Sequence, residues 1–208
     1  MKTIGATSYK QTRFGIMPRA KLIPLEIEGI KKAWDFVLLK NRQGKILINP
    51  LFIKQIHKIG FGWIFPEMGS EFRKIDVQAS AHLAPKFYLI PELISEYCKD
   101  LSVRIKYLPK IKENDFIDKL VSLLAWAHHK FLWIHPFKDY NGRIGRLLIN
   151  AILLNLNLPP IELKIETLSG RKRYIKALQS ADKQDYNKLE KIIKLALEEA
   201  GASPADYL

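Results

Sequence analysis

Residues 135–146 read HPFKDYNGRIGR, and they separate two stretches with a helical pattern. The stretch before them, ENDFIDKLVSLLAWAHHKFLWI at 113–134, repeats apolar residues every three or four positions. The residues of that face are Phe116, Leu120, Leu124, Ala127 and Phe131. The stretch after them is apolar almost all round from Leu147 onward, which is typical of a helix in the middle of a bundle. Because Pro136 ends the first helix, the sequence predicts a loop that leads from an amphipathic helix into a buried one.

Most of the remaining chain has the same helical periodicity. Further helices are expected at about 25–38, 49–61, 91–105, 170–182 and 185–201. The apolar face of the first of these is predicted to consist of Ile27, Ile30, Trp34, Val37 and Leu38. At about 69–85 the pattern alternates instead, which favours a short β-hairpin. The predicted fold is therefore mainly α: a helical bundle with a small β-hairpin flap, with residues 1–48 as an N-terminal arm and residues 49–208 as the core.

Composition limits the class of protein. With 208 residues, of which 48% are hydrophobic, the chain is long enough for one well-buried core. It has neither an eighteen-residue apolar run nor a secretory signal pattern, which predicts a soluble cytoplasmic protein with no place in a membrane. The single cysteine, Cys98, has apolar neighbours in its expected helix and is predicted to be a buried filler. A net charge of +13 favours polyanionic partners, but the basic residues are scattered and do not identify one.

The second half of the quoted loop is suited to an anion. Asn141 and Gly142 can turn the chain and leave free backbone N–H groups at a helix N-terminus, where an anion is favoured. Arg143 and Arg146 share a face of that first turn, where positive charges oppose the helix dipole. Two arginines at this end of a helix are explained if a phosphate chain lies between them.

The first half of the loop carries a carboxylate and a base. Asp139 supplies one hard oxygen ligand, which suits Mg²⁺ bound jointly by a carboxylate and phosphates. His135 can take a proton near neutral pH from an attacking hydroxyl. Phe137 is expected to turn inward and anchor the loop. Each residue alone has an ordinary structural explanation, but together they describe a base, a metal ligand and an anion site.

The quoted residues resemble the signature of Fic proteins, His-Pro-Phe-x-Asp/Glu-Gly-Asn-Gly-Arg-x-x-Arg. The resemblance extends more weakly over about residues 49–200: GSEFRKIDV and APKFYLIPEL resemble the flap region, and PPI with RKRYIKAL resembles the segment behind the nucleotide. It implies a protein adenylyltransferase, which transfers AMP from ATP to a hydroxyl side chain of a target protein. Mg²⁺ is the implied cofactor, and the flap, at about 70–82, would bind the target as an added strand.

The resemblance also implies a role for each residue of the loop. His135 would deprotonate the target hydroxyl and Asp139 would hold Mg²⁺. The residues implied in nucleotide binding are Asn141, Gly142 and Arg143 around the α- and β-phosphates, Arg146 at the outer phosphate, and Tyr174 beside the nucleoside. Attack at the α-phosphorus would then be in line, with positioning and charge stabilisation supplying most of the acceleration.

One position departs from the signature, because Tyr140 stands where the family has glycine. A tyrosine is costly if that position needs a positive φ. We favour an ordinary backbone at residue 140, with the ring packed outward or over the nucleotide.

A second resemblance concerns an internal inhibitor. Fic proteins with an inhibitory helix carry Ser/Thr-x-x-x-Glu-Gly/Asn before the core, and this chain has PLEIEGI at 24–30. Glu28 and Gly29 match, whereas Pro24 stands where Ser or Thr is expected, a place where it could open the helix. The resemblance implies that Glu28 pairs with Arg146 and keeps the resting enzyme slow.

Several alternatives stay open at the level of sequence. Family members also use UTP, other nucleotides or phosphocholine donors, and some remove AMP. A Fic fold that binds nucleotide or a partner with weak or no catalysis would account for Tyr140. A metal-dependent hydrolase, with His128 and His129 near the loop, lacks the usual ligand spacing. A nucleic-acid binder would explain the charge but leave the loop idle. A homodimer is neither required nor excluded.

Overall fold

The computed structural model describes residues 9–68, 71–79 and 82–201. In chain order the elements are β1 (Tyr9–Thr12), β2 (Gly15–Pro18), α1 (Arg19–Arg42), α2 (Pro50–His57), the π-helical η1 (Lys58–Gly62), the 3₁₀ turn η2 (Pro66–Met68), β3 (Gln78–Ala79), β4 (His82–Leu83), the 3₁₀ turn η3 (Phe87–Leu89), α3 (Ile90–Lys106), α4 (Phe116–Ile134), α5 (Asn141–Asn155), α6 (Leu168–Ala181) and α7 (Asn187–Glu199). The prediction of a mainly α fold is confirmed.

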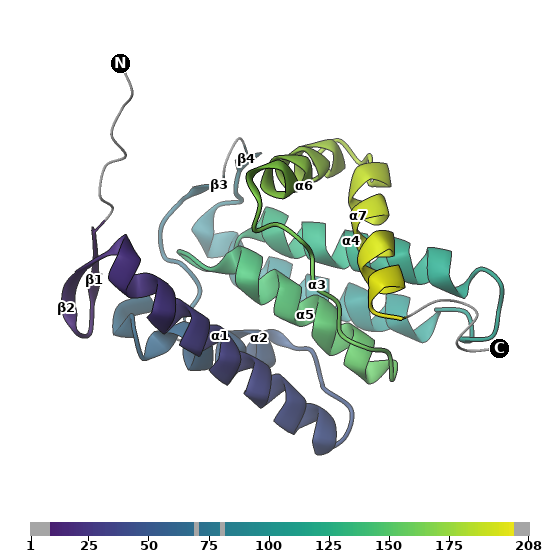
Figure 1. Cartoon of the computed structure of the whole chain (residues 1–208), viewed down its shortest axis with the longest axis horizontal. Helices are drawn as coiled ribbons and strands as arrows, with labels where there is room; N and C mark the ends of the chain where they lie inside the picture. Colours follow the sequence, from purple (N-terminus) through teal and green to yellow (C-terminus); the bar gives the residue numbers. More distant parts are fainter. Residues whose placement is uncertain (1–8, 69–70, 80–81, 202–208) are drawn as a thin grey trace.

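Helix α5 lies at the centre of the bundle. It packs against α4 on one side and against α1 and α2 on the other, while α4 also contacts α3 and α7 (Figure 1). Buried residues occur on every side of α5, and all five residues of the predicted face of α4 are buried. Both predictions are thus confirmed. The loop 135–140, between α4 and α5, is held by the two most buried helices of the chain.

Helix α1 differs from its prediction in length and in phase. It begins at Arg19, so Pro24 lies inside the helix and does not open it. Its buried face consists of Leu22, Glu26, Gly29, Ala33 and Val37. Ile27, predicted to be buried, is 55% exposed.

Close backbone packing explains the phase of α1. A Cβ atom on Gly29 would lie 2.0 Å from the carbonyl oxygen of Gly60 in η1, so the two backbones are in direct contact. Ala33 completes this contact with a single methyl group. The face with the smallest side chains therefore packs inward, and Glu26, on that face, points into the protein.

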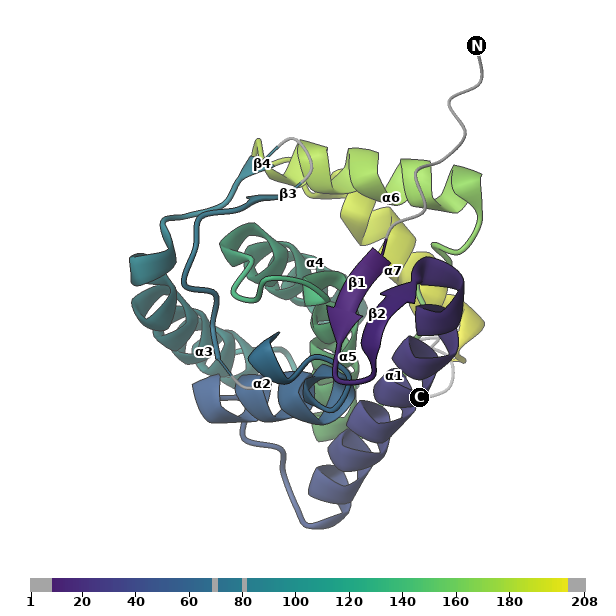
Figure 2. The ribbon, with the colours of Figure 1, turned by 90° about the vertical axis from the view of Figure 1, so that its left-hand side faces the viewer.

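Two β-hairpins lie at the end of the bundle where α5 begins (Figures 1 and 2). Strands β3 and β4 form the predicted flap as a two-residue antiparallel pair, and residues 69–70 and 80–81 of the predicted range lie outside the described residues. Strands β1 and β2 form a second hairpin, with Tyr9 opposite Pro18 and Thr12 opposite Gly15, which the sequence did not predict. This second hairpin brings the N-terminal segment up to the loop 135–140.

Three smaller features concern single elements of the fold. Asn49 caps α2, since its side chain accepts a hydrogen bond from the Phe52 amide at 2.8 Å. Cys98 is buried, and burial raises the pKa of its thiol to about 12, so it stays protonated at neutral pH. Within the described residues, no helix combines the length and the apolar character that a membrane span requires.

Candidate active site

His135 follows the last residue of α4 in a left-handed conformation, with φ of 51°. Its Nδ1 atom lies 3.2 Å from the carbonyl oxygen of Leu132. Because a carbonyl can only accept, Nδ1 carries the proton and Nε2 is the basic nitrogen. Burial lowers the pKa of His135 below its ordinary value, so the ring is neutral at neutral pH. A neutral imidazole with a fixed tautomer is the form that a general base requires.

The loop after His135 is held in place by buried contacts of Phe137 and Asn141. Phe137 is fully buried and stacks on His57, with ring centroids 3.8 Å apart, which confirms its predicted inward orientation. The Asn141 side chain accepts from the Phe137 amide at 2.9 Å and donates to the Phe137 carbonyl at 2.8 Å. Both polar ends of Asn141 are therefore used within the loop. What Asn141 can offer an anion is its backbone N–H at the start of α5.

Tyr140 corrects the expectation of an ordinary backbone. Its φ is +67°, in the left-handed region that costs about 1–2 kcal/mol for a residue with a Cβ. The ring turns inward, where it stacks on Phe61 with centroids 3.9 Å apart. Its hydroxyl donates to Glu26 Oε1 at 2.8 Å, and burial, followed by this carboxylate, raises the pKa of Tyr140. Packing and hydrogen bonding thus offset the backbone strain.

Asp139 is surrounded by donors. Its Oδ1 accepts from the Tyr140 amide at 2.7 Å, and its Oδ2 forms an ion pair with Lys10 of β1. Burial on its own would raise the pKa of Asp139, but the hydrogen bonds from Lys10 and the Tyr140 amide outweigh it, and the pKa is lowered. The carboxylate is charged at neutral pH and already holds one cationic group. The role of Asp139 as a metal ligand stays a prediction.

Arg143 is paired with a buried glutamate that the sequence did not predict. Its Nη2 donates to Glu26 Oε2 at 2.8 Å, and Glu26 is only 1% exposed. Arg19 donates to the other carboxylate oxygen at 2.9 Å, so Glu26 accepts from two arginines and one tyrosine. The Nη1 atom of Arg143 is buried without a partner among the described residues. This guanidinium retains hydrogen-bonding capacity that a ligand could use.

Arg146 is held by an uncharged partner. Its guanidinium interacts with the hydroxyl of Tyr174, whose oxygen lies 2.5 Å from His128 Nε2. Burial lowers the pKa of His128 to about 3, so this ring is neutral and can accept from Tyr174. Gly145 makes room for the ring, because a Cβ there would lie 3.2 Å from His128. Tyr174 lines the site as predicted, but its hydroxyl orients Arg146.

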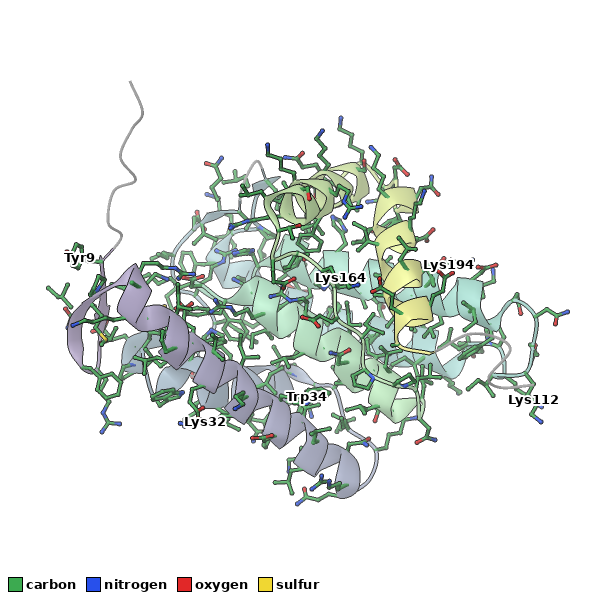
Figure 3. The ribbon with its side chains drawn as sticks, viewed as in Figure 1. Tyr9, Lys32, Trp34, Lys112, Lys164 and Lys194 are labelled. Carbon is green, nitrogen blue, oxygen red and sulfur yellow. The ribbon has the colours of Figure 1, made fainter. Side chains whose placement is uncertain are left out.

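Glu28 does not contact Arg146, so the predicted pairing is wrong in this structure. Glu28 lies on the exposed face of α1 and pairs loosely with Lys32, 3.8 Å away. Figure 3 labels Lys32 on α1, on the side of the helix that faces solvent. Two residues correspond to a rotation of about 200° around a helix, so Glu26 and Glu28 cannot face the same side. Glu26 occupies the inward position.

One cavity of about 520 Å³ joins these residues. His135, Asp139, Gly142, Arg143 and Arg146 line it at the start of α5, and residues of α6 line the other end. Its size is within the range of small-molecule sites. Within the described residues, His, Cys, Asp and Glu side chains form no group of three or more that could hold a metal ion.

Comparison with known proteins agrees with this geometry. The family model for the Fic/DOC family matches residues 47–153. This chain belongs to the Fic/DOC family. The match includes the loop 135–140 and the first residues of α5, together with the flap, and it ends inside α5.

The Fic/DOC relatives are mostly longer than this chain. A curated protein adenylyltransferase Fic from Culex quinquefasciatus is 31% identical over 162 residues, which are 77% of this chain and 30% of that protein. The solved structure of Fic-1 from C. elegans is 25% identical, with a TM-score of 0.63 over 88% of this chain and 50% of that chain. The BepC protein from Bartonella tribocorum, solved with bound AMPPNP, covers 93% of this chain and 94% of its own, with a TM-score of 0.66 at 16% identity. The chain spans about a third of the length of the curated relatives that it matches.

Sequence reasoning missed three residues around the site. Glu26 could have been found from the spacing of Leu22, Gly29 and Ala33, if small residues had been weighed as packing positions. Lys10 carries no such signal, because its partner Asp139 is 129 positions away. Arg73 stands in the flap segment and is buried. Its side chain bonds backbone carbonyls, and a backbone partner leaves no signal in the sequence.

Proposed function

We propose that this protein transfers AMP from ATP to a hydroxyl side chain of a target protein, in the cavity at the start of α5. The observation that carries the proposal is that one cavity is lined by His135, Asp139, Gly142, Arg143 and Arg146. A base, an anion site and two arginines are what in-line attack on a nucleotide requires. The curated relatives named protein adenylyltransferase support the same reaction.

The proposed step gives each of the named groups of this chain a separate task. The target oxygen forms a bond to the α-phosphorus while the bond from that phosphorus to the leaving oxygen of pyrophosphate breaks. The hydroxyl proton passes to Nε2 of His135, which the Leu132 carbonyl keeps in the right tautomer. Arg143, Arg146 and the first N–H groups of α5 stabilise charge on the phosphate oxygens.

The residues present fit the implied Mg²⁺. Asp139 is a charged carboxylate that already attracts the ammonium group of Lys10. Mg²⁺ is commonly held by one or two carboxylates together with substrate phosphates, so a single aspartate suffices. When bound, the metal would neutralise charge on the phosphates. Asp139 would hold it, and Lys10 would have to leave that oxygen.

The flap is proposed to bind the target. Strands β3 and β4 pair only with each other among the described residues, so an extended segment could add to their edge. Leu83 and Ile75 are 70% and 52% exposed at this hairpin, which gives the added segment apolar surface to cover. His82 of β4 lies in the same cavity as His135, so a segment bound there would be close to the base.

We propose that Glu26, and not Glu28, is the inhibitory glutamate. Glu26 takes one amino group of Arg143 and is anchored by Arg19 and Tyr140. A phosphate that binds Arg143 must compete with the Glu26 carboxylate for the guanidinium. The negative charges of the phosphate and the carboxylate would also repel each other when both lie beside Arg143. The described state is therefore a resting state in which ATP binds weakly or without its phosphates in the productive position.

A second candidate is a nucleotide- or partner-binding protein with little catalysis. The specific observation in its favour is that Arg143 and Asp139 are both already paired, with Glu26 and Lys10. A nucleic-acid binder is less favoured, because labelled lysines such as Lys112, Lys164 and Lys194 are spread over different parts of the molecule (Figure 3). Lys164 and Lys194 are moreover paired with Glu199 and Asp118.

Intact-mass spectrometry tests the proposal. The wild type, Glu26→Gln and Glu26→Gln/His135→Ala would be incubated with Mg²⁺ and each nucleoside triphosphate in turn. We expect Glu26→Gln to gain the mass of one AMP with ATP, the wild type to gain it slowly, and the double variant to gain none. Glu28→Gln is the matched control, since it changes a glutamate on the exposed face of the same helix.

The outcomes separate the candidates. A gain in mass with another nucleotide would show that this nucleotide, and not ATP, is the donor. A gain in mass in Glu28→Gln but not in Glu26→Gln would show that Glu28 is the inhibitor. Calorimetric binding of ATP without a covalent product in any variant, also when candidate target proteins are added, would favour the binding protein. Loss of mass from a target that already carries AMP would identify the reverse reaction.

A further inference from the structure

Arg73 is a buried arginine that the proposed reaction does not use. It lies between η2 and β3, at the base of the flap, and is only 5% exposed. It is not among the residues that line the cavity of His135. A buried guanidinium normally requires a specific set of partners, because desolvating a charge is costly.

The partners of Arg73 are backbone carbonyls from both sides of the site. On the side of the loop 135–140, its Nε donates to the His135 carbonyl at 2.8 Å and its amide donates to the Pro136 carbonyl at 2.8 Å. On the side of the flap, Nη1 donates to the Ile75 carbonyl at 2.7 Å and Nη2 to the Pro85 carbonyl at 2.5 Å. Ile75 precedes β3 and Pro85 follows β4. The side chain of Arg73 thus ties both ends of the flap to the His135–Pro136 peptide unit, and its backbone amide holds the next peptide unit, Pro136–Phe137.

These carbonyls are also what stabilises the buried charge. The C-terminus of α4 carries unsatisfied carbonyls and a partial negative charge, which favour a cation. The nearest acidic residue, Asp76, is instead bonded to Lys86 at 2.7 Å. Among the described residues Arg73 therefore forms its bonds with backbone oxygens and not with a carboxylate. An arginine is suited to this task because its donors form a rigid planar fork.

The position of His135 depends on the same peptide units. His135 has a left-handed backbone, which a residue with a Cβ keeps only when its surroundings fix it. Arg73 holds the carbonyl of His135 and that of the next residue, which leaves the His135 backbone little freedom to relax. His82 of β4 adds a second tie, since its Nε2 lies 3.2 Å from the Trp133 carbonyl.

We infer that Arg73 is a positioning residue that fixes the His135 base and the target-binding flap in one geometry. The inference rests on the proposed function and adds to it a coupling between the flap and the base. Displacement of the flap would move the backbone of the base, because the same guanidinium holds both. Arg73 acts through His135 and the flap and is not itself a catalytic residue.

The test uses Arg73→Lys and Arg73→Gln, each in the Glu26→Gln protein, with Lys74→Gln as the control at the neighbouring exposed position. Lysine keeps the charge but cannot span the carbonyls of His135, Ile75 and Pro85, which the guanidinium bonds, and glutamine removes the charge. We expect both Arg73 variants to transfer AMP to themselves or to a target at least tenfold more slowly, while their Kd for ATP changes less than twofold. The Lys74→Gln protein should match its parent.

A histidine titration followed by NMR gives a readout that a merely structural role would not move. The charged or titratable groups that face His135 are Arg73, His82 and Asp139. Because the positive charge of Arg73 lowers the pKa of His135, Arg73→Gln should raise that pKa and move the acid limb of the pH–rate profile to higher pH. Arg73→Lys should leave the limb close to its original place while the rate falls.

The results that would overturn the inference are distinct from failure of the proposed function. Parent-like rates in both Arg73 variants would overturn it, and so would a His135 pKa that does not respond to Arg73→Gln. If thermal melts show that neither variant folds, Arg73 is structural and the inference is wrong. If Glu26→Gln itself transfers nothing, the proposed function fails, while the His135 pKa and its dependence on Arg73 can still be measured.

Discussion

Arg143 and Arg146 are three residues apart on α5, yet their surroundings differ in the charge of the partner. Arg143 is bound by the buried carboxylate of Glu26, whereas Arg146 is held by the phenol of Tyr174. A neutral partner orients a guanidinium without competing for its charge, so under the proposed function Arg146 would be available to a phosphate. An anionic partner competes directly with a phosphate. The two arginines show that neighbouring guanidinium groups of one site can have a neutral partner at one position and an anionic partner at the next.

The largest effect is expected from removing the charge of Glu26, because Arg143 would then have a neutral partner as Arg146 has. Glu26→Gln keeps the shape and can still accept from Tyr140, but it no longer competes as an anion. Hydrogen bonds to charged groups are worth about 1.5–3 kcal/mol, so we expect transfer to accelerate about ten- to a hundredfold. The rate of mass gain with ATP is the measurement. An unchanged rate, with Glu28→Gln as the control, would show that Arg143 is not blocked.

Tyr140 tests what keeps Glu26 in place. Tyr140→Phe removes one hydrogen bond to the carboxylate and should destabilise the fold by about 1 kcal/mol. Tyr140→Gly relieves about 1–2 kcal/mol of left-handed strain but loses a buried ring, at a cost of about 3–5 kcal/mol.

We therefore expect Tyr140→Gly to be less stable than the wild type by about 2 kcal/mol in chemical denaturation. A more stable glycine variant would mean that strain outweighs the packing on Phe61. Tyr174→Phe, which removes the phenol beside Arg146, is the matched control because it should not alter the hold on Glu26.

A double-mutant cycle sharpens the comparison of the arginines directly. Arg146→Gln should weaken ATP binding about tenfold in any background, which corresponds to about 1.4 kcal/mol. Arg143→Gln should do so only when Glu26 is also glutamine, because in the wild type its charge is already taken. Calorimetric Kd values supply the cycle. Equal effects of Arg143→Gln in both backgrounds would contradict the blocked position.

In the proposed site, the ion pair of Lys10 with Asp139 is expected to hinder Mg²⁺ less than Glu26 hinders a phosphate at Arg143. The pair of Lys10 with Asp139 is partly exposed, and such pairs are worth about 0.2–1 kcal/mol. Lys10→Met should therefore improve Mg²⁺ binding in the presence of a non-hydrolysable ATP analogue by about two- to fivefold, measured by calorimetry. Lys31→Met, at an exposed position of α1, is the control. Unchanged Mg²⁺ affinity in Lys10→Met would mean that Lys10 and the metal do not compete for Asp139.

The sequence was sufficient where the signal is local. The periodicity of α4 and α5, the stop at Pro136 and the residues of the loop place His135 and both arginines in one site. Long-range contacts decide the rest. The phase of α1 follows from the contact of Gly29 with Gly60, and an apolar pattern does not register glycine as a packing residue. The hairpin of β1 and β2 is stabilised by bonds to remote partners, including one from the Arg13 amide to the Ile64 carbonyl. Its short strands carry no hydrophobic pattern that would have predicted it.

The backbone contact between Gly29 and Gly60 makes the thickness of one methyl group decide how closely α1 packs on η1. Glu26 reaches Arg143 only because α1 sits at the depth that two glycines permit. Residue 29 is therefore a spacer, because its missing side chain sets how closely Glu26 approaches Arg143. Under the proposed function, a glycine far from the reacting atoms would set how firmly the resting state is held.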